Sequence, residues 1–172
     1  MLEKKVEKAF NDQINAELYS SYLYLSMSAY FESLNLKGFA NWMRVQAQEE
    51  LVHAMKFCGF INDRGGRVTL GAIEKPETDW AGPKAAFEEA YKHECKVTAL
   101  INSLVELAVA EKDHAANSFL QWFVNEQVEE EASADLMARK LATMEKAPGG
   151  LYMLDNEAGQ RTFTMPTGAE GE

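Results

Sequence analysis

The stretch QAQEELVHAMKF, at residues 46–57, decides the fold. Its apolar residues recur at spacings of three and four, which is typical of an amphipathic helix with one face turned toward a core. Glu50 and His53 lie on that same face, because residues three apart in a helix are neighbours. Burying a carboxylate and an imidazole among apolar side chains is costly. The stretch therefore indicates a helical bundle with a polar site inside it.

Three other segments show the same periodicity. We predict long helices over residues 4–34, 37–64, 83–111 and 114–146, with prolines and glycines at their edges. A short apolar segment predicts a fifth helix at about 149–161, and we expect the polar tail at about 164–172 to be mobile. A chain of 172 residues with 47% apolar content suits a single domain spanning residues 1–172.

The lengths of the connections predict the topology. About three residues join the first two helices and a similarly short turn joins the last two, so each pair should be antiparallel. The segment between Arg64 and Pro83, about 18 residues long, can reach roughly 60 Å when extended, whereas a 27-residue helix is about 40 Å long. This segment can therefore run the length of the bundle and make the second and third helices parallel. The predicted fold class is all-α: a four-helix bundle with one long crossover loop and a short fifth C-terminal helix.

Carboxylates interrupt the inward stripe of all four long helices at a similar depth. The interrupting residues are Glu17, Glu50 with His53, Glu94, and Glu130 with Gln127 one turn before it. Lys and Arg are missing from these stripes, so either the glutamates are protonated or cations neutralise them. A glutamate combined with Glu-x-x-His is the ligand arrangement of di-iron carboxylate bundles, and such ligands suit iron better than structural zinc. A lone Glu-x-x-His would be a weak signal, but its coincidence with four stripes predicts a metal centre.

The composition excludes several other classes of function. A net charge of −10 argues against binding nucleic acid, whose phosphates need Lys and Arg. No stretch approaches the ~20 apolar residues of a membrane helix, and the N-terminal residues lack the apolar segment of a secretory signal. We therefore predict a cytoplasmic protein. Cys58 and Cys95 form no Cys-x-x-Cys pair, and we expect both to be reduced thiols in the core.

From Asn11 to about Arg161 the sequence resembles the bacterial and archaeal non-haem ferritins. The stretches that carry the resemblance are NDQINAELYS at 11–20, QEELVHA at 48–54 and WFVNEQVEEE at 122–131. The resemblance implies a ferritin-like bundle that binds Fe(II), oxidises it with O2 or peroxide, and deposits Fe(III) as mineral. It also implies a homo-oligomeric shell of 24 chains. The charge and the lack of a long apolar stretch lead us to expect neither nucleic acid nor a membrane as a partner.

The resemblance also implies a role for each residue of the centre. Glu17, Glu50 and His53 would hold a first iron, and Glu94 and Glu130 a second, with Glu50 bridging the two. Two further residues are implied to lie beside the irons. Gln127 would form hydrogen bonds with the ligands, and Tyr24 would be the tyrosine that the family has at its centre. A third iron site is implied at Glu49, Glu126 and Glu129, with Glu130 shared.

Some positions depart from related families. Leu51 stands where bacterioferritins have a haem-ligating methionine, so we expect no haem. Asn117 and Leu120 stand where animal ferritins have acidic channel residues, which puts that route for iron in doubt. We expect His93 to face solvent, because it is rotated by about 100° from Glu94, and His114 to lie on the surface.

Two other functions stay open at this point. A di-iron oxidase or peroxidase without a storage role would use the same cluster of ligands. A purely structural bundle would merely tolerate the buried acids, although their mutual repulsion argues against it.

Overall fold

The computed structural model describes residues 2–144 and 146–165, and its regular structure there is helical. The helices are α1 (Lys4–Ser33), α2 (Lys37–Asp63), α3 (Pro83–Ala110), α4 (His114–Met144) and α5 (Gly150–Ala158). The predicted all-α class and all five predicted helices are confirmed, with ends that differ by at most a few residues. Most of the tail predicted to be mobile lies outside the described residues.

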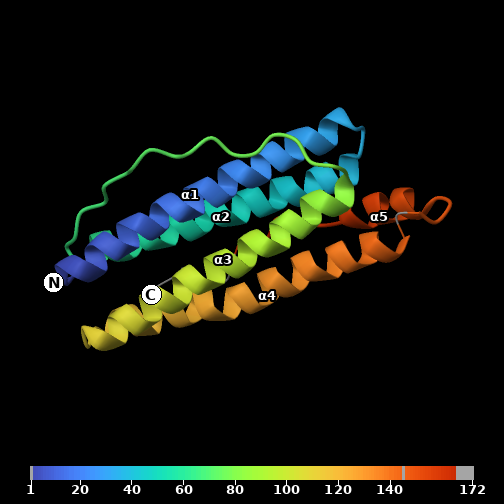
Figure 1. Cartoon of the computed structure of the whole chain (residues 1–172). Helices are drawn as coiled ribbons and strands as arrows, with labels where there is room; N and C mark the ends of the chain where they lie inside the picture. Colours follow the sequence, from blue (N-terminus) through green and yellow to red (C-terminus); the bar gives the residue numbers. More distant parts are fainter. Residues whose placement is uncertain (1, 145, 166–172) are drawn as a thin grey trace.

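The four long helices run side by side along one axis, as Figure 1 shows. The segment 64–82 passes along α1 to the opposite end of the bundle, so α2 and α3 run in the same direction, as the length of this segment predicts (Figure 1). The side chain of Asn11 fastens this crossover to α1. Its Nδ2 donates to the carbonyl oxygen of Arg67 at 3.0 Å, and its Oδ1 accepts from the backbone N–H of Thr69 at 2.6 Å.

Both short turns use a residue in the left-handed region. Asn35 has φ 58° between α1 and α2, and Lys112 has φ 57° between α3 and α4. The carboxylate of Asp113 then accepts from the backbone N–H of Ala116 at 3.0 Å, which satisfies a free donor in the first turn of α4. The guanidinium of Arg64 donates to both oxygens of the same carboxylate, at 3.1 and 3.0 Å. One aspartate thus joins the end of α2 to the start of α4.

The short helix α5 crosses the start of α2 at close range. A Cβ atom at Gly38 would lie 1.5 Å from the backbone oxygen of Asp155, so only glycine permits this approach. The backbone N–H of Phe39 donates to the side chain of Asp155 at 2.8 Å. These contacts fix α5 across one end of the bundle.

A polar layer divides the apolar core in two. One cluster of buried side chains includes Phe31, Phe39, Met43, Phe87 and Leu141. The other includes Phe10, Phe57, Ile101, Leu120 and Phe123. On each long helix, buried polar residues lie between the parts that contribute to the two clusters. The candidate centre therefore sits at mid-length, with packed aromatic residues on both sides.

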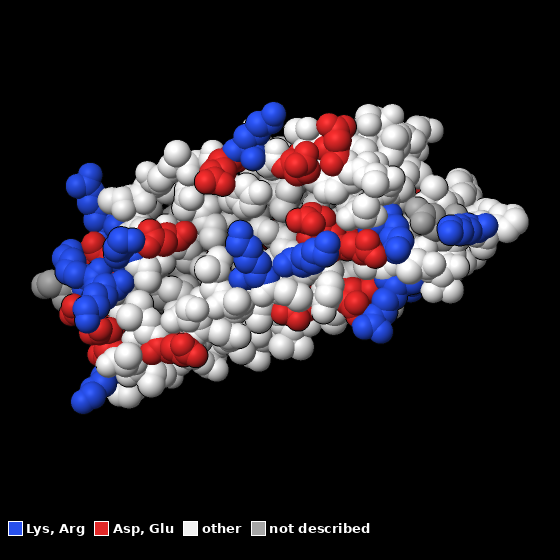
Figure 2. All heavy atoms as spheres, in the orientation of Figure 1, with Lys and Arg blue, Asp and Glu red and all other residues white. Residues whose placement is uncertain are grey.

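Basic and acidic side chains are intermixed over most of the face in Figure 2, and several basic side chains gather at its left end, near the N-terminus. None of the described helices is long and apolar enough to cross a membrane. His114 is exposed, as predicted. Cys58 and Cys95 are free thiols, as predicted; both are half-buried, and Cys58 packs against one of the two core clusters. Both lie on helix flanks beside the inward stripe.

Candidate metal centre

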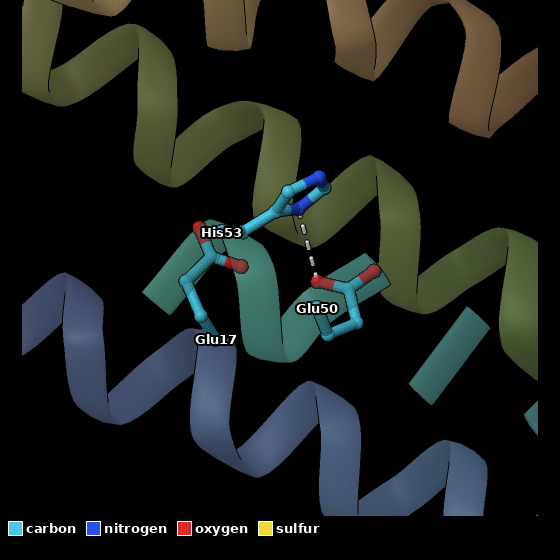
Figure 3. A group of neighbouring side chains, drawn as sticks. All are labelled: Glu17, Glu50 and His53. Atoms are coloured by element: carbon cyan, nitrogen blue, oxygen red, sulfur yellow. Dashed lines mark ion pairs between the residues drawn. The ribbon is translucent and has the colours of Figure 1, made fainter. Parts of the chain in front are cut away.

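Three of the predicted ligands form a compact group in the middle of the bundle. Glu17 comes from α1, and Glu50 and His53 come from successive turns of α2 (Figure 3). One ligand atom from each residue lies within 4.8 Å of the other two. All three side chains are buried, and His53 Nδ1 lies 3.4 Å from Glu50 Oε2. Two carboxylates and an imidazole at this spacing can hold a divalent ion such as iron.

Glu94 and Glu130 lie in the same polar layer but outside that compact group. Both are buried, on α3 and α4. The amide of Gln46 connects one of them to the group: its Nε2 donates to Glu50 Oε1 at 2.9 Å and to Glu130 Oε2 at 2.6 Å. The two carboxylates that share this amide belong to helices far apart in sequence, so the layer is one connected site.

Glu94 has its own hydrogen-bond partners in the layer. The hydroxyl of Tyr24 donates to Glu94 Oε1, and the amide of Gln127 donates to Glu94 Oε2 at 3.2 Å. Gln127 Nε2 also lies 3.3 Å from Thr98 Oγ1. Tyr24 and Gln127 therefore orient Glu94 and stand beside the cluster, where the resemblance implies them.

Gln13 and Gln46 are site residues that were not predicted, although both stand in the inward stripes. Gln13 donates to Glu17 Oε1 at 2.9 Å, as Gln46 does to Glu50. Each glutamine precedes its glutamate by four residues, which puts the pair on one helical face. The spacing of a glutamine four residues before a glutamate in the inward stripe could therefore have predicted these two hydrogen bonds. The other oxygen of Glu17, Oε2, is buried without a hydrogen-bond partner among the described residues.

The carboxylates of the layer favour their protonated form. Burial and the nearby charge of Glu50 raise the pKa of Glu17 to about 8. The same two causes raise the pKa of Glu130 to about 7. Burial, with the charges of Glu50 and Glu130, holds the pKa of Glu94 well above its usual range. At neutral pH the layer therefore keeps protons that exposed carboxyl groups would lose.

His53 and Glu50 behave in the opposite way. Burial alone would lower the pKa of His53, but the charge of Glu50 and its hydrogen bond raise it to about 10. Burial alone would raise the pKa of Glu50, but His53 holds it below the usual value. The metal-free centre therefore contains an ion pair surrounded by protonated acids. A metal ion must replace these protons, since ligands bind in their deprotonated form.

The residues implied for a third iron surround a cavity of about 260 Å³ beside the centre. Glu49 and Glu126 are half-buried there and Glu129 is exposed, and His53 and Glu130 also line the cavity. Burial raises the pKa of both Glu49 and Glu126. The cavity thus connects the implied third site to the central group through two shared side chains.

The prediction for His93 is wrong. Its side chain is buried, and its Nε2 lies 2.8 Å from the hydroxyl oxygen of Ser20. The spacing of apolar residues predicted an inward face of α3 centred near Tyr91, whereas the buried face includes Ala90 and Val97. This rotation brings His93 under the ring of Tyr19, with 5.9 Å between the ring centroids.

Comparison with protein families and curated relatives agrees with this geometry. The profile of the ferritin-like domain matches residues 7–144. A bacterial non-haem ferritin of Bacteroides fragilis is 44% identical over 161 residues, which cover 94% of this chain and 100% of the relative. A bacterial non-haem ferritin of Staphylococcus aureus is 37% identical over 95% of this chain and 98% of its own length.

Solved structures of archaeal ferritins are similar over nearly the whole chain. An open-pore ferritin from Archaeoglobus fulgidus has a TM-score of 0.93 and 54% identity, and the match covers 94% of this chain and 100% of the other. A form of the Archaeoglobus fulgidus ferritin engineered to be closed has a TM-score of 0.94 and 55% identity, with 95% and 100% covered.

Proposed function

Because the chain belongs to the ferritin family, we propose that it oxidises Fe(II) at the buried centre and stores the Fe(III) inside a shell built from its own copies. The observation that carries this proposal is the convergence of Glu17, Glu50 and His53 within 4.8 Å inside the bundle. In this account iron is the substrate and the cargo, and the side chains select, orient and release it.

The proposed arrangement uses two irons per chain. Glu17 and His53 bind the first iron, Glu94 and Glu130 bind the second, and Glu50 bridges them. The central place of Glu50 supports the bridge: it lies 3.4 Å from His53, and it shares one amide donor with Glu130. A bridging carboxylate also keeps two ions at the short separation that paired redox chemistry needs.

The chain's own groups prepare the centre for this chemistry. Tyr24 and Gln127 donate to Glu94 and hold it in the layer. Buried carboxylates stabilise Fe(III) more than Fe(II), because its charge is higher. O2 or peroxide takes the electrons in this proposal, and no haem takes part.

The shell and the third iron are parts of the same proposal. We place the third iron at Glu49, Glu126 and Glu129, with Glu130 shared. The side chains of all four residues line one cavity beside the centre. The assembly is a 24-chain shell in the cytoplasm. Its support is the near-complete overlap with relatives that are ferritins.

Glu50→Ala tests the centre, because it removes the proposed bridge. Its initial rate of Fe(II) oxidation in air should fall at least about tenfold, the usual cost of losing a metal-binding interaction. The control is Glu106→Ala, which removes an exposed glutamate of α3 and should oxidise iron at the wild-type rate. Equal rates for wild-type protein and Glu50→Ala would show that the oxidation happens elsewhere.

A further inference from the structure

An arginine from the segment after α5 reaches into the acidic cavity beside the centre. The guanidinium of Arg161 forms an ion pair with Glu49 Oε2 and lies 4.3 Å from the centroid of the Trp42 ring. The side chain of Asn41 donates to the carbonyl oxygen of Arg161 at 2.8 Å, which fastens this segment to α2. Two contacts with α2 therefore position the guanidinium, and a third holds the backbone of Arg161.

The cavity is otherwise acidic. The carboxylates that line it are Glu49, Glu126, Glu129 and Glu130. Of the described residues around it, Arg161 is the one Lys or Arg. Its Nη1 is buried and has no hydrogen-bond partner in the described parts of the chain. The guanidinium is thus held among acids while one of its donors is unused.

A guanidinium cannot coordinate a metal ion, and it keeps its charge at any ordinary pH. A metal ion at this cavity would draw on the same carboxylate of Glu49 that Arg161 pairs with. The two cations therefore compete for one carboxylate. Because Arg161 does not lose its proton, the metal ion can bind only by displacing the guanidinium.

We propose that Arg161 is a tethered counter-cation that holds Glu49 when the third iron site is empty, and that a third metal ion binds by displacing its guanidinium. Arg161 therefore lowers the affinity of the third site and lets iron leave it again. This inference rests on the proposed function, because it takes the cavity beside the centre as an iron site.

The test compares anaerobic Zn²⁺ titrations of wild-type protein, Arg161→Ala and Arg161→Gln in the fully assembled form. Zn²⁺ is used because it occupies oxygen and nitrogen ligands without redox chemistry. Losing a charge-assisted hydrogen bond corresponds to roughly 10- to 100-fold in affinity, so the third Zn²⁺ should bind that much more tightly to both variants. The two tighter sites per chain should not change.

Two controls isolate the effect. Arg44→Ala removes the same charge from the exposed pair with Glu32, away from the cavity, and should leave all three affinities unchanged. Adding Glu49→Gln to Arg161→Ala should abolish the gain, because it removes the contested carboxylate. A crystal soaked in Zn²⁺ should show a third ion with Arg161 moved away from Glu49.

The outcomes separate this inference from the function on which it rests. Two tight sites with an unchanged, weaker or missing third site in the Arg161 variants would overturn the inference alone. A third Zn²⁺ bound while the Arg161–Glu49 pair stays intact would do the same. Absence of the two tight sites in wild-type protein would overturn the proposed centre as well.

Discussion

Replacing Glu17 with glutamine should stabilise the metal-free protein while weakening its metal binding. The pKa of Glu17 is raised from 4.5 to about 8 in the fold, so at pH 7 the folded chain keeps a proton that the unfolded chain has lost. Each pKa unit corresponds to about 1.4 kcal/mol. The difference between the unfolded pKa of 4.5 and pH 7 therefore lowers the free energy of unfolding of the wild-type protein by about 3 kcal/mol. Glutamine carries no proton that can be lost. Its amide can also accept from Gln13 and donate toward Glu50.

The sign of the pH dependence follows from the same values. Below pH 4.5 both states of wild-type protein hold the proton and the cost is absent; it grows as the pH rises and is complete above the folded pKa of about 8. The advantage of Glu17→Gln should therefore be near zero at pH 4.5 and reach up to about 3 kcal/mol at pH 7. For a chain of this size this corresponds to an increase of roughly 6–12 °C in Tm.

Thermal melts of chelator-treated protein, followed by circular dichroism at pH 5 and pH 7, measure this difference. Glu106→Gln is the control, since it changes an exposed glutamate and should shift Tm by little at either pH. Saturating Zn²⁺ should raise the Tm of wild-type protein more than that of Glu17→Gln. The reasoning is refuted if Glu17→Gln melts at or below the wild-type temperature at pH 7, or if the difference does not grow with pH.

Two other predictions follow from the same structure. Anaerobic binding of Zn²⁺ at pH 7 should release about three to four protons per chain, from Glu17, Glu94 and His53 and in part from Glu130. The affinity for Zn²⁺ should fall as the pH is lowered. Calorimetry in buffers of different ionisation enthalpy measures both, and metal binding without proton release would contradict the protonated centre. Gly38→Ala should lower the stability by about 1–3 kcal/mol, because its Cβ would overlap the backbone oxygen of Asp155, and an unchanged Tm would show that α5 does not pack there.

The fold was largely predictable because its signals are local. Prolines, short turns and the spacing of apolar residues set the helix ends, and the length of the segment 64–82 was enough to predict parallel α2 and α3. The central group was predictable for the same reason: Glu50 and His53 are fixed by one helix, and the stripe of α1 puts Glu17 at the same depth.

The remaining features depend on how helices are rotated and on contacts distant in sequence. The spacing of apolar residues alone did not fix how α3 is rotated about its own axis. For this reason His93 was expected to face solvent, although it is buried. The pairing of Arg161 with Glu49 joins residues more than 100 positions apart and carries no periodic signal. Spacing also could not show that Glu94 stands outside the compact group and accepts hydrogen bonds from Tyr24 and Gln127.

The iron retained per chain after loading with Fe(II) in air, measured together with the mass of the particle, tests the central claim most directly. The account predicts a large shell that retains far more iron than the two or three ions its side chains can coordinate. Retention of only about two irons per chain in a small oligomer would contradict storage and favour a di-iron oxidase or peroxidase. Protein that retains no iron at all would contradict the metal centre itself.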